Sequence, residues 1–270
     1  MENLLSYPSF EHIQAFVLGT PRLFMIMHTA PFLGSTLLPG HIRFTVVCAC
    51  YLVLHPMLLA NLPEWQGLAF GTSLELGILF LKECFLGLLM GLLAGMMFWG
   101  IQCAGFFIDN QRGAGMAAQA DPLSGEETSP TGSFLFQSAI YVFFSTGAFF
   151  TFLGLIYASY EFWPVWESLP ASLLRKPALG LFFAGKVADL TMDMMLLSGP
   201  IVVACLLTDL SLGLINRFAS QLNVYVLAMP VKSGLASFLL IFYFSMLMSG
   251  AVTIFDAFGT DLQYLRNLMP

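Results

Sequence analysis

A polar stretch in the middle of the chain constrains the fold more than any other feature of the sequence. Residues 109–133 read DNQRGAGMAAQADPLSGEETSPTGS and lie between two long apolar runs. Bare backbone cannot face hydrocarbon, because its N–H and C=O groups would be left without hydrogen bonds. This stretch must therefore lie in water or line a cavity within protein. We interpret it as the working part that the apolar segments hold in place.

The composition predicts a membrane protein. Of the 270 residues, 58% are hydrophobic and only 10% are charged, whereas a soluble domain has about 25% charged residues. The apolar runs are long and continuous, unlike the alternating segments of about ten residues in a membrane β-barrel. We therefore expect an all-α, polytopic membrane protein of helical hairpins with broken helices. The net charge of −6 argues against nucleic acid as a partner.

The cysteines and histidines indicate neither a disulfide framework nor a metal site. All five cysteines lie inside apolar runs and their number is odd, which favours buried, reduced side chains. The four histidines occur singly, and no group of His, Cys, Asp and Glu has the spacing of zinc or iron ligands. We expect no metal and no cofactor.

Six apolar regions can be separated along the chain. At about 1.5 Å per residue, one helix over the third region would exceed a hydrocarbon core of about 30 Å, so it should project beyond the bilayer or break. Pro21 should kink the first helix or begin a second piece of it, and Gly199–Pro200 predicts a two-piece helix or a hairpin bend in the fifth. The regions are approximately residues 12–34, 42–62, 73–108, 134–160, 178–217 and 234–258.

A stripe of small residues marks the third region. Gly87, Gly91 and Gly95 follow Glu83 at intervals of four residues, which places them along one helix face. Such a face lets another backbone come close. The sequence leaves open whether that backbone belongs to this chain or to another subunit.

Charged side chains inside the apolar regions need partners, because a lipid-facing charge is costly. Arg22 should therefore point at protein, water or headgroups. For Glu75, Lys82 and Glu83, local pairing is favoured over proton transport. In the fifth region a lysine and the aspartate three residues after it share a helix face and can pair locally. The charges singled out in that region are Lys186, Asp189, Asp193, Asp209 and Arg217.

Several stretches, in chain order, together resemble one family. They are KECFLGLLMG (82–91) leading into GFFIDNQRG (105–113), the Asp121–Pro122 pair with its Gly/Ser/Thr-rich sequel, and the segment from Gly199–Pro200 to QLNV (221–224) and PVKS (230–233). They resemble the T-type export-gate subunit of type III secretion systems, the family shared with the flagellar FliR protein, and are closer to the injectisome branch. The motif residues of the last segment are Gln221, Leu222, Asn223, Pro230 and Lys232. One departure is Ser220, where the pattern leads us to expect a proline.

The resemblance implies partners and a location. Members of that family assemble with R-type and S-type subunits into a helical, hetero-oligomeric export gate through which unfolded polypeptides pass. It further implies contact with the U-type switch protein, the large export-gate protein and the lipid bilayer. The gate lies in the bacterial inner membrane at the core of the secretion basal body, partly raised toward the periplasm. The chain would be a single export-gate domain over residues 1–270, structural rather than enzymatic.

The same resemblance implies that a polar loop at about residues 105–133 forms part of the plug that closes the pore. Aromatic rings at a constriction exclude water and ions, and a Gly/Ala-rich backbone can shift aside at low cost. The alternative is a plain solvent loop between two helices. The residues assigned to the plug are Phe106, Phe107, Asp109, Asn110, Gln111, Arg112, Gly113, Gly115 and Asp121.

Two other functional classes fit parts of the sequence. A stand-alone ion-coupled transporter would use the intramembrane charges and the broken helices, although no repeat relates the first three apolar regions to the last three. A membrane enzyme is a weaker hypothesis, because no nucleophile–base constellation, HExxH motif or phosphate-binding glycine loop is present.

Overall fold

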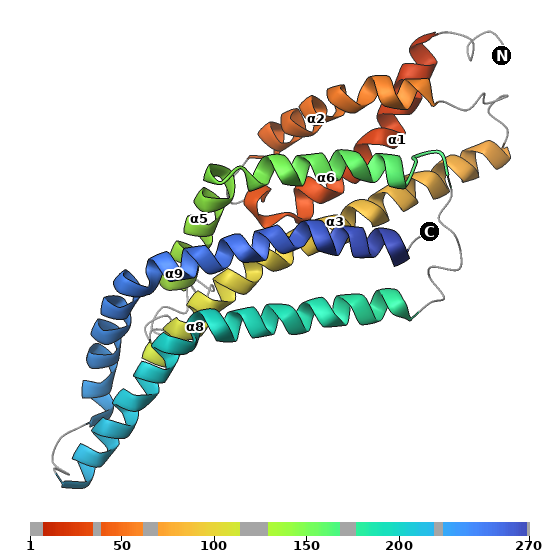
Figure 1. Ribbon diagram of the computed structural model, residues 1–270. Helices are drawn as coiled ribbons and strands as arrows, with labels where there is room; N and C mark the ends of the chain where they lie inside the picture. Colours follow the sequence, from red (N-terminus) through yellow and green to blue (C-terminus); the bar gives the residue numbers. More distant parts are fainter. Residues whose placement is uncertain are drawn as a thin grey trace. The chain divides into compact units, whose positions relative to one another are not determined.

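The described part of the chain is built of helices (Figure 1). The computed structural model describes residues 8–34, 39–61, 70–113, 129–167, 177–218 and 224–268. In chain order the elements are α1 (Pro8–Thr29), the short 3₁₀ helix η2 (Pro31–Leu33), α2 (Gly40–Ala60), α3 (Phe70–Arg112), α5 (Pro130–Ser145), α6 (Ala148–Phe162), α8 (Ala178–Phe218) and α9 (Val224–Leu268).

Four of the described helices are long and apolar enough to cross a membrane. They are α2, α3, α8 and α9, and the bent pair α5 and α6 adds a fifth candidate if it counts as one broken span. The prediction of an all-α, polytopic membrane protein with broken helices is confirmed.

The helix breaks do not fall where the prolines predicted them. α1 contains Pro21 and α8 contains Pro200, and each is a single helix, so a second helical piece at either proline is wrong. The alternative given for Pro21, a kink, stays a prediction. A proline removes one backbone hydrogen bond but leaves the neighbouring bonds, and a long helix can absorb it by bending. Figure 1 shows the ribbon of α8 bending without a gap. The third apolar region was expected either to break or to project beyond the bilayer. α3 runs unbroken for 43 residues, so the break is wrong and projection is the alternative that remains.

The observed break lies in the fourth apolar region, between α5 and α6. Thr146 and Gly147 separate the two helices, and Gly147 has a φ of +78°. This left-handed conformation is accessible to glycine and costly for residues with a β-carbon. The expected link between the fifth and sixth regions is also shorter than predicted, because α9 begins at Val224 and includes Pro230 and Lys232.

The chain divides into two compact units. Unit 1 comprises Met1–Gly95, Phe149–Phe183 and Ala257–Pro270, and unit 2 comprises Met96–Ala148 and Ala184–Asp256. The helices α3, α8 and α9 contribute residues to both. The expectation of a single export-gate domain stays a prediction.

In unit 1, α1 packs against α2 and against the glycine stripe of α3. Gly87 lies against the backbone of Arg22, and Gly91 lies against Thr29, so a β-carbon at either glycine would overlap α1. At these two positions the approaching backbone therefore belongs to this chain. Gly95 is buried as well.

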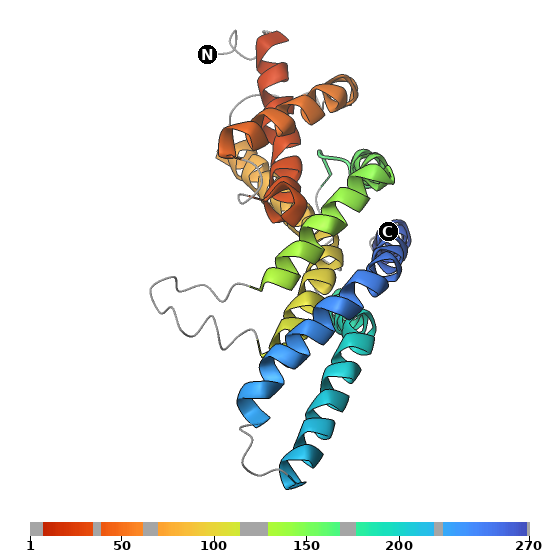
Figure 2. The same cartoon turned by 90° about the vertical axis from the view of Figure 1, so that its left-hand side faces the viewer.

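In unit 2, aromatic and aliphatic side chains join α3, α5, α8 and α9. The Phe98 ring lies 5.3 Å from that of Phe143 and 5.1 Å from that of Phe255. A second cluster joins the end of α3 to α8 and α9, which lie side by side in both views (Figures 1 and 2). Its buried members are Ile108, Ile201, Cys205 and Ala236.

Candidate functional site

Two helix ends meet at the base of the polar loop. α3 ends at Arg112, and Gly113 follows with a φ of +83°. α5 begins at Pro130 after the N-cap Ser129, whose hydroxyl accepts a hydrogen bond from the Gly132 N–H at 2.9 Å. About two turns before the end of α3, Gly105 lies directly against the backbone of Gly132. The two helices therefore touch through glycine backbones where the loop leaves and returns.

The Asp109 carboxylate joins the two sides of this base. The side chain is buried and forms an ion pair with Arg112 of the same helix, with 2.8 Å between Oδ1 and Nη2. Its Oδ2 atom accepts hydrogen bonds from the Ser129 hydroxyl at 2.6 Å and from the Thr131 N–H at 2.9 Å. A carboxylate at a helix N-terminus is also favoured by the helix dipole. Asp109 thus fixes the start of α5 to the end of α3.

A second ion pair joins α8 to α9 in the same unit. The Lys232 ammonium lies 2.9 Å from Oδ1 and 3.1 Å from Oδ2 of Asp209. The start of α9 also reaches the end of α3, because a β-carbon placed on Gly113 would lie 3.5 Å from the Met229 side chain. The GFFIDNQRG and PVKS stretches, which are more than a hundred residues apart, therefore come together.

The other residues singled out from the sequence have varied surroundings. Phe106 is 39% exposed, Phe107 and Gln111 are half-buried, and Asn110 is exposed. In α8, Lys186 and Asp189 form the expected local pair, with 2.9 Å between Nζ and Oδ2. Asp193 is half-buried and Arg217 is exposed at the end of α8. Gly115, Asp121, Gln221, Leu222 and Asn223 lie outside the described residues.

The sequence did not reveal the charged cluster in unit 1 that is the most deeply buried among the described residues. Arg22 on α1 and Glu83 on α3 are 61 positions apart and both side chains are fully buried. The guanidinium donates from Nε to Oε2 at 2.7 Å and from Nη2 to Oε1 at 2.8 Å. Lys82 lies 2.8 Å from the same Oε1 atom. The signal was present in part, because an arginine and a glutamate in apolar helices each need a partner.

Every N–H direction of the Arg22 guanidinium finds an acceptor. Nη1 donates to the Ser159 carbonyl at 2.8 Å and to the Ser159 hydroxyl at 3.1 Å, and Nη2 also donates to the Trp163 carbonyl at 2.8 Å. The guanidinium carbon lies 4.1 Å from the centre of the Tyr160 ring, a cation–π contact. The Tyr160 hydroxyl donates in turn to the Gly19 carbonyl at 2.8 Å. Arg22 therefore ties α1 to α3 and α6.

Lys82 fixes the segment that follows α6. Its ammonium donates to the carbonyls of Pro164 at 2.7 Å, Val165 at 3.0 Å and Glu167 at 2.9 Å. A buried ammonium with three carbonyl acceptors and a carboxylate is fully satisfied and does not face an open cavity. This arrangement can hold the segment in place, and it offers no site for a substrate.

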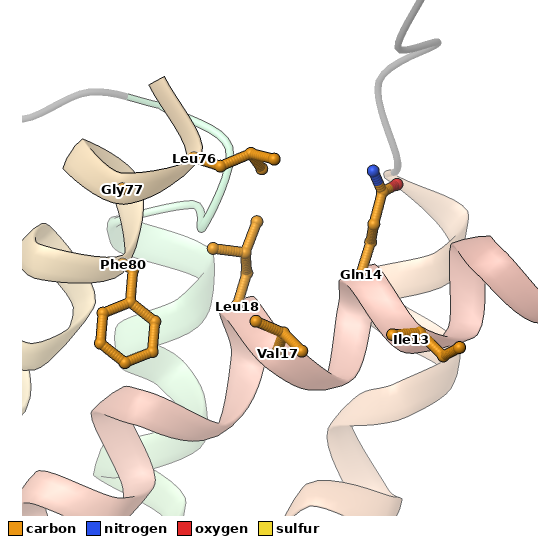
Figure 3. Close-up of a pocket in the computed structure, with 7 residues that line it drawn as sticks. All are labelled: Ile13, Gln14, Val17, Leu18, Leu76, Gly77 and Phe80. Atoms are coloured by element: carbon orange, nitrogen blue, oxygen red, sulfur yellow. The ribbon is translucent and has the colours of Figure 1, made fainter. Parts of the chain in front are cut away.

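An open apolar groove lies between α1 and α3 (Figure 3). Its volume is about 290 Å³, and Gln14 supplies the amide at its edge. The remaining lining residues, shown in Figure 3, are Ile13, Val17, Leu18, Leu76, Gly77 and Phe80. With no charged side chain in its lining, the groove suits an apolar group rather than a polar substrate.

Together these features define a helical, integral membrane protein in which the deeply buried charges of the described residues are paired and the base of the polar loop is held by Asp109. Comparison with known proteins gives the family. The chain belongs to the bacterial export proteins, family 1, whose family model matches residues 13–258.

Named relatives cover most of the chain. It is 40% identical over 237 residues to the Yop proteins translocation protein T of Yersinia pestis, across 87% of this chain and 88% of the relative. It is 32% identical over 240 residues to the surface presentation of antigens protein SpaR of Salmonella typhimurium, across 88% and 86%. It is 32% identical over 192 residues to the flagellar biosynthetic protein FliR of Bacillus subtilis, across 71% and 72%. The predicted resemblance to the T-type export-gate family, injectisome branch, is confirmed.

Proposed function

We propose that this chain is the T-type subunit of a type III secretion export gate, with a structural and gating role and no catalytic one. The observation that carries the proposal is the 40% identity, over nearly the whole length of both chains, to a protein named for translocation of Yop proteins. The match to a flagellar biosynthetic protein supports a role common to both kinds of apparatus. The bacterial inner membrane follows as the location, at the core of the basal body and partly raised toward the periplasm.

The proposed gate contains the R-type and S-type subunits as partners and passes unfolded polypeptides, with the U-type switch protein and the large export-gate protein close by. The presence of partner subunits is supported by the apolar helix surface that this chain does not bury by itself. In the most apolar stretch of α3, 67% of residues are buried, whereas the corresponding shares are 28% in α8 and 22% in α9. Helices of a partner subunit, together with lipid, would cover these faces.

The proposed closing element of the gate is the polar segment at about residues 105–133. Its first residues, up to Arg112, belong to α3, and its last, from Pro130, belong to α5, so the expected loop is shorter than the sequence predicted. The clamped base supports this role. The bonds of Asp109 to Ser129 and Thr131 hold the two loop ends at one place, so the loop would leave a fixed point beside the half-exposed Phe106 and Phe107. A loop anchored in this way can move into or out of a pore while α3 and α5, the helices that carry it, stay in contact.

The assembly is tested by co-purification. When the tagged full-length chain is extracted from native membranes in mild detergent, two small apolar proteins of the R and S types should accompany it in a fixed ratio. A chain that purifies as a monomer or dimer and moves a solute in liposomes would instead support an ion-coupled transporter. The pairing of Lys186 with Asp189 and of Lys232 with Asp209 leaves these charges less suited to that alternative.

The plug is tested by leakage in the assembled complex. Replacing Phe106 and Phe107 by alanine removes two rings from the proposed constriction, and water and ions should then pass the resting gate. The expected result is an increase of inner-membrane permeability to small dyes and ions, while the complex still assembles. Phe150→Ala, at an exposed phenylalanine of α6, is the matched control. Unchanged permeability in an assembled double variant would count directly against the plug.

A further inference from the structure

Histidines lie at both ends of the contact between α1 and α2. At one end, the Nδ1 atom of His12 lies 2.9 Å from the Nε2 atom of His55, and their rings are stacked with centroids 5.1 Å apart. At the other end, Nη1 of Arg43 donates to Nδ1 of His28 at 3.4 Å. We call these two contacts the histidine contacts of the α1–α2 pair.

The space between the two contacts is packed with apolar and aromatic groups. The Phe16 ring meets the Tyr51 ring edge-on at 5.0 Å, and Gly19 lies against Tyr51 and Leu58. The Tyr51 hydroxyl extends the first contact, because its oxygen lies 2.7 Å from Nδ1 of His55. The two histidine contacts themselves lie at the exposed ends of this packed region.

The hydrogen bond between His12 and His55 can persist after one ring gains a proton, but not after both rings do. With both rings neutral, one ring donates an N–H and the other accepts, and the Tyr51 hydroxyl adapts because it can donate or accept. With one proton added, a cationic His55 donates to both His12 and Tyr51. With two protons added, Nδ1 of His12 and Nε2 of His55 both carry hydrogens at 2.9 Å, so the bond is lost and two positive charges meet.

The second histidine contact responds to acid in the same direction. Arg43 is always a donor and always positive, so it needs an unprotonated Nδ1 on His28. Protonation of His28 removes that acceptor and places two cations in contact. Besides these residues and Tyr51, α1 and α2 carry the titratable or charged side chains of Glu11, Arg22, His41, Cys48 and Cys50. The part of α3 that packs on α1 adds Glu75, Lys82, Glu83 and Cys84, of which Lys82 and Glu83 are buried in the Arg22 cluster. Glu11 and Glu75 are both exposed to solvent, where their charges are screened.

We propose that the α1–α2 pair is an acid-sensitive clasp, closed when the His12–His55 contact holds at most one added proton and His28 holds none, and loosened when His12, His55 and His28 are all protonated. An unperturbed imidazole changes charge at about pH 6.5. Acidification therefore weakens both ends of one helix contact together, while the apolar packing between them is unchanged.

The test is hydrogen–deuterium exchange of the full-length chain in detergent, at about pH 7.5 and about pH 5.0, corrected for intrinsic exchange. Exchange of the α2 amides reports local opening of the pair. In the natural protein it should rise about tenfold at the lower pH, the factor expected for losing one or two hydrogen bonds. The double variant His12→Gln/His28→Gln keeps neutral partners for His55 and Arg43, so its exchange should change less than about twofold.

A control variant keeps the outcome decisive. His41→Gln removes an exposed histidine at the start of α2 and should leave the acid response intact. The clasp is overturned if the natural protein exchanges equally at both pH values, if the double variant responds like the natural protein, or if His41→Gln abolishes the response.

Discussion

Replacing Arg22 by methionine is expected to lower the free energy of unfolding by about 3–5 kcal/mol, the usual cost of removing one partner from a buried ion pair. Methionine fills similar space, so the loss arises from the missing charge and donors. Glu83 would keep only Lys82 as a partner, and the carbonyls of Ser159 and Trp163 would lose their donor. Both side chains of the pair are fully buried, so water cannot replace these bonds.

The measurement is unfolding of the purified chain in detergent, followed by tryptophan fluorescence. Trp163 and Trp166 lie in the segment that Arg22 and Lys82 hold, so their emission reports the affected region. Arg22→Lys should recover part of the loss, because an ammonium keeps the charge but cannot reach every acceptor of the guanidinium fork. Arg217→Met, at an exposed arginine, is the matched control and should change the free energy by less than about 0.5 kcal/mol. A cost for Arg22→Met no larger than that of the control would refute the role of the cluster.

Replacing Gly105 by alanine is expected to cost about 1–3 kcal/mol and to open the base of the polar loop. A β-carbon at residue 105 would stand 2.5 Å from Cα and 2.6 Å from N of Gly132. Both obstacles are backbone atoms, so no side-chain rotation can relieve the overlap, and α3 must move away from α5. The Thr131 N–H would then leave the Asp109 carboxylate, which accepts it at 2.9 Å.

A matched glycine on the same helix separates this overlap from the general effect of adding a methyl group. Gly77 has nothing within 4 Å of an added β-carbon, so Gly77→Ala should be neutral or stabilise the helix by up to about 1 kcal/mol. Unfolding of both variants in detergent gives the comparison, and protease cleavage within residues 114–128 should be faster in the Gly105 variant. Equal stability and equal cleavage of the two variants would show that the glycine contact does not hold the loop base.

Local sequence chemistry predicted the pairs that form within one helix. Lys186 and Asp189 are three residues apart, and side chains at that spacing are neighbours on any helix. The glycine stripe of α3 was also visible, because four-residue spacing places small residues on one face. The helix that packs on this stripe could not be predicted, since either α1 or a helix of another subunit could have approached it. The helix breaks were misjudged because a proline in a long helix has more than one outcome, whereas Gly147 marks a break only through its backbone angle.

Composition and apolar run length by themselves determined that this chain is an all-α membrane protein, because a membrane-buried backbone has few ways to satisfy its hydrogen bonds. Short specific motifs determined its family, since they are recognised in the sequence without knowledge of which residues touch in the folded protein. Only the tertiary structure decided that Arg22 pairs with Glu83, that Asp109 holds Ser129 and Thr131, and that Lys232 meets Asp209. The physical reason is that these partners lie on different helices, and which faces of two helices meet depends on the packing of the whole unit.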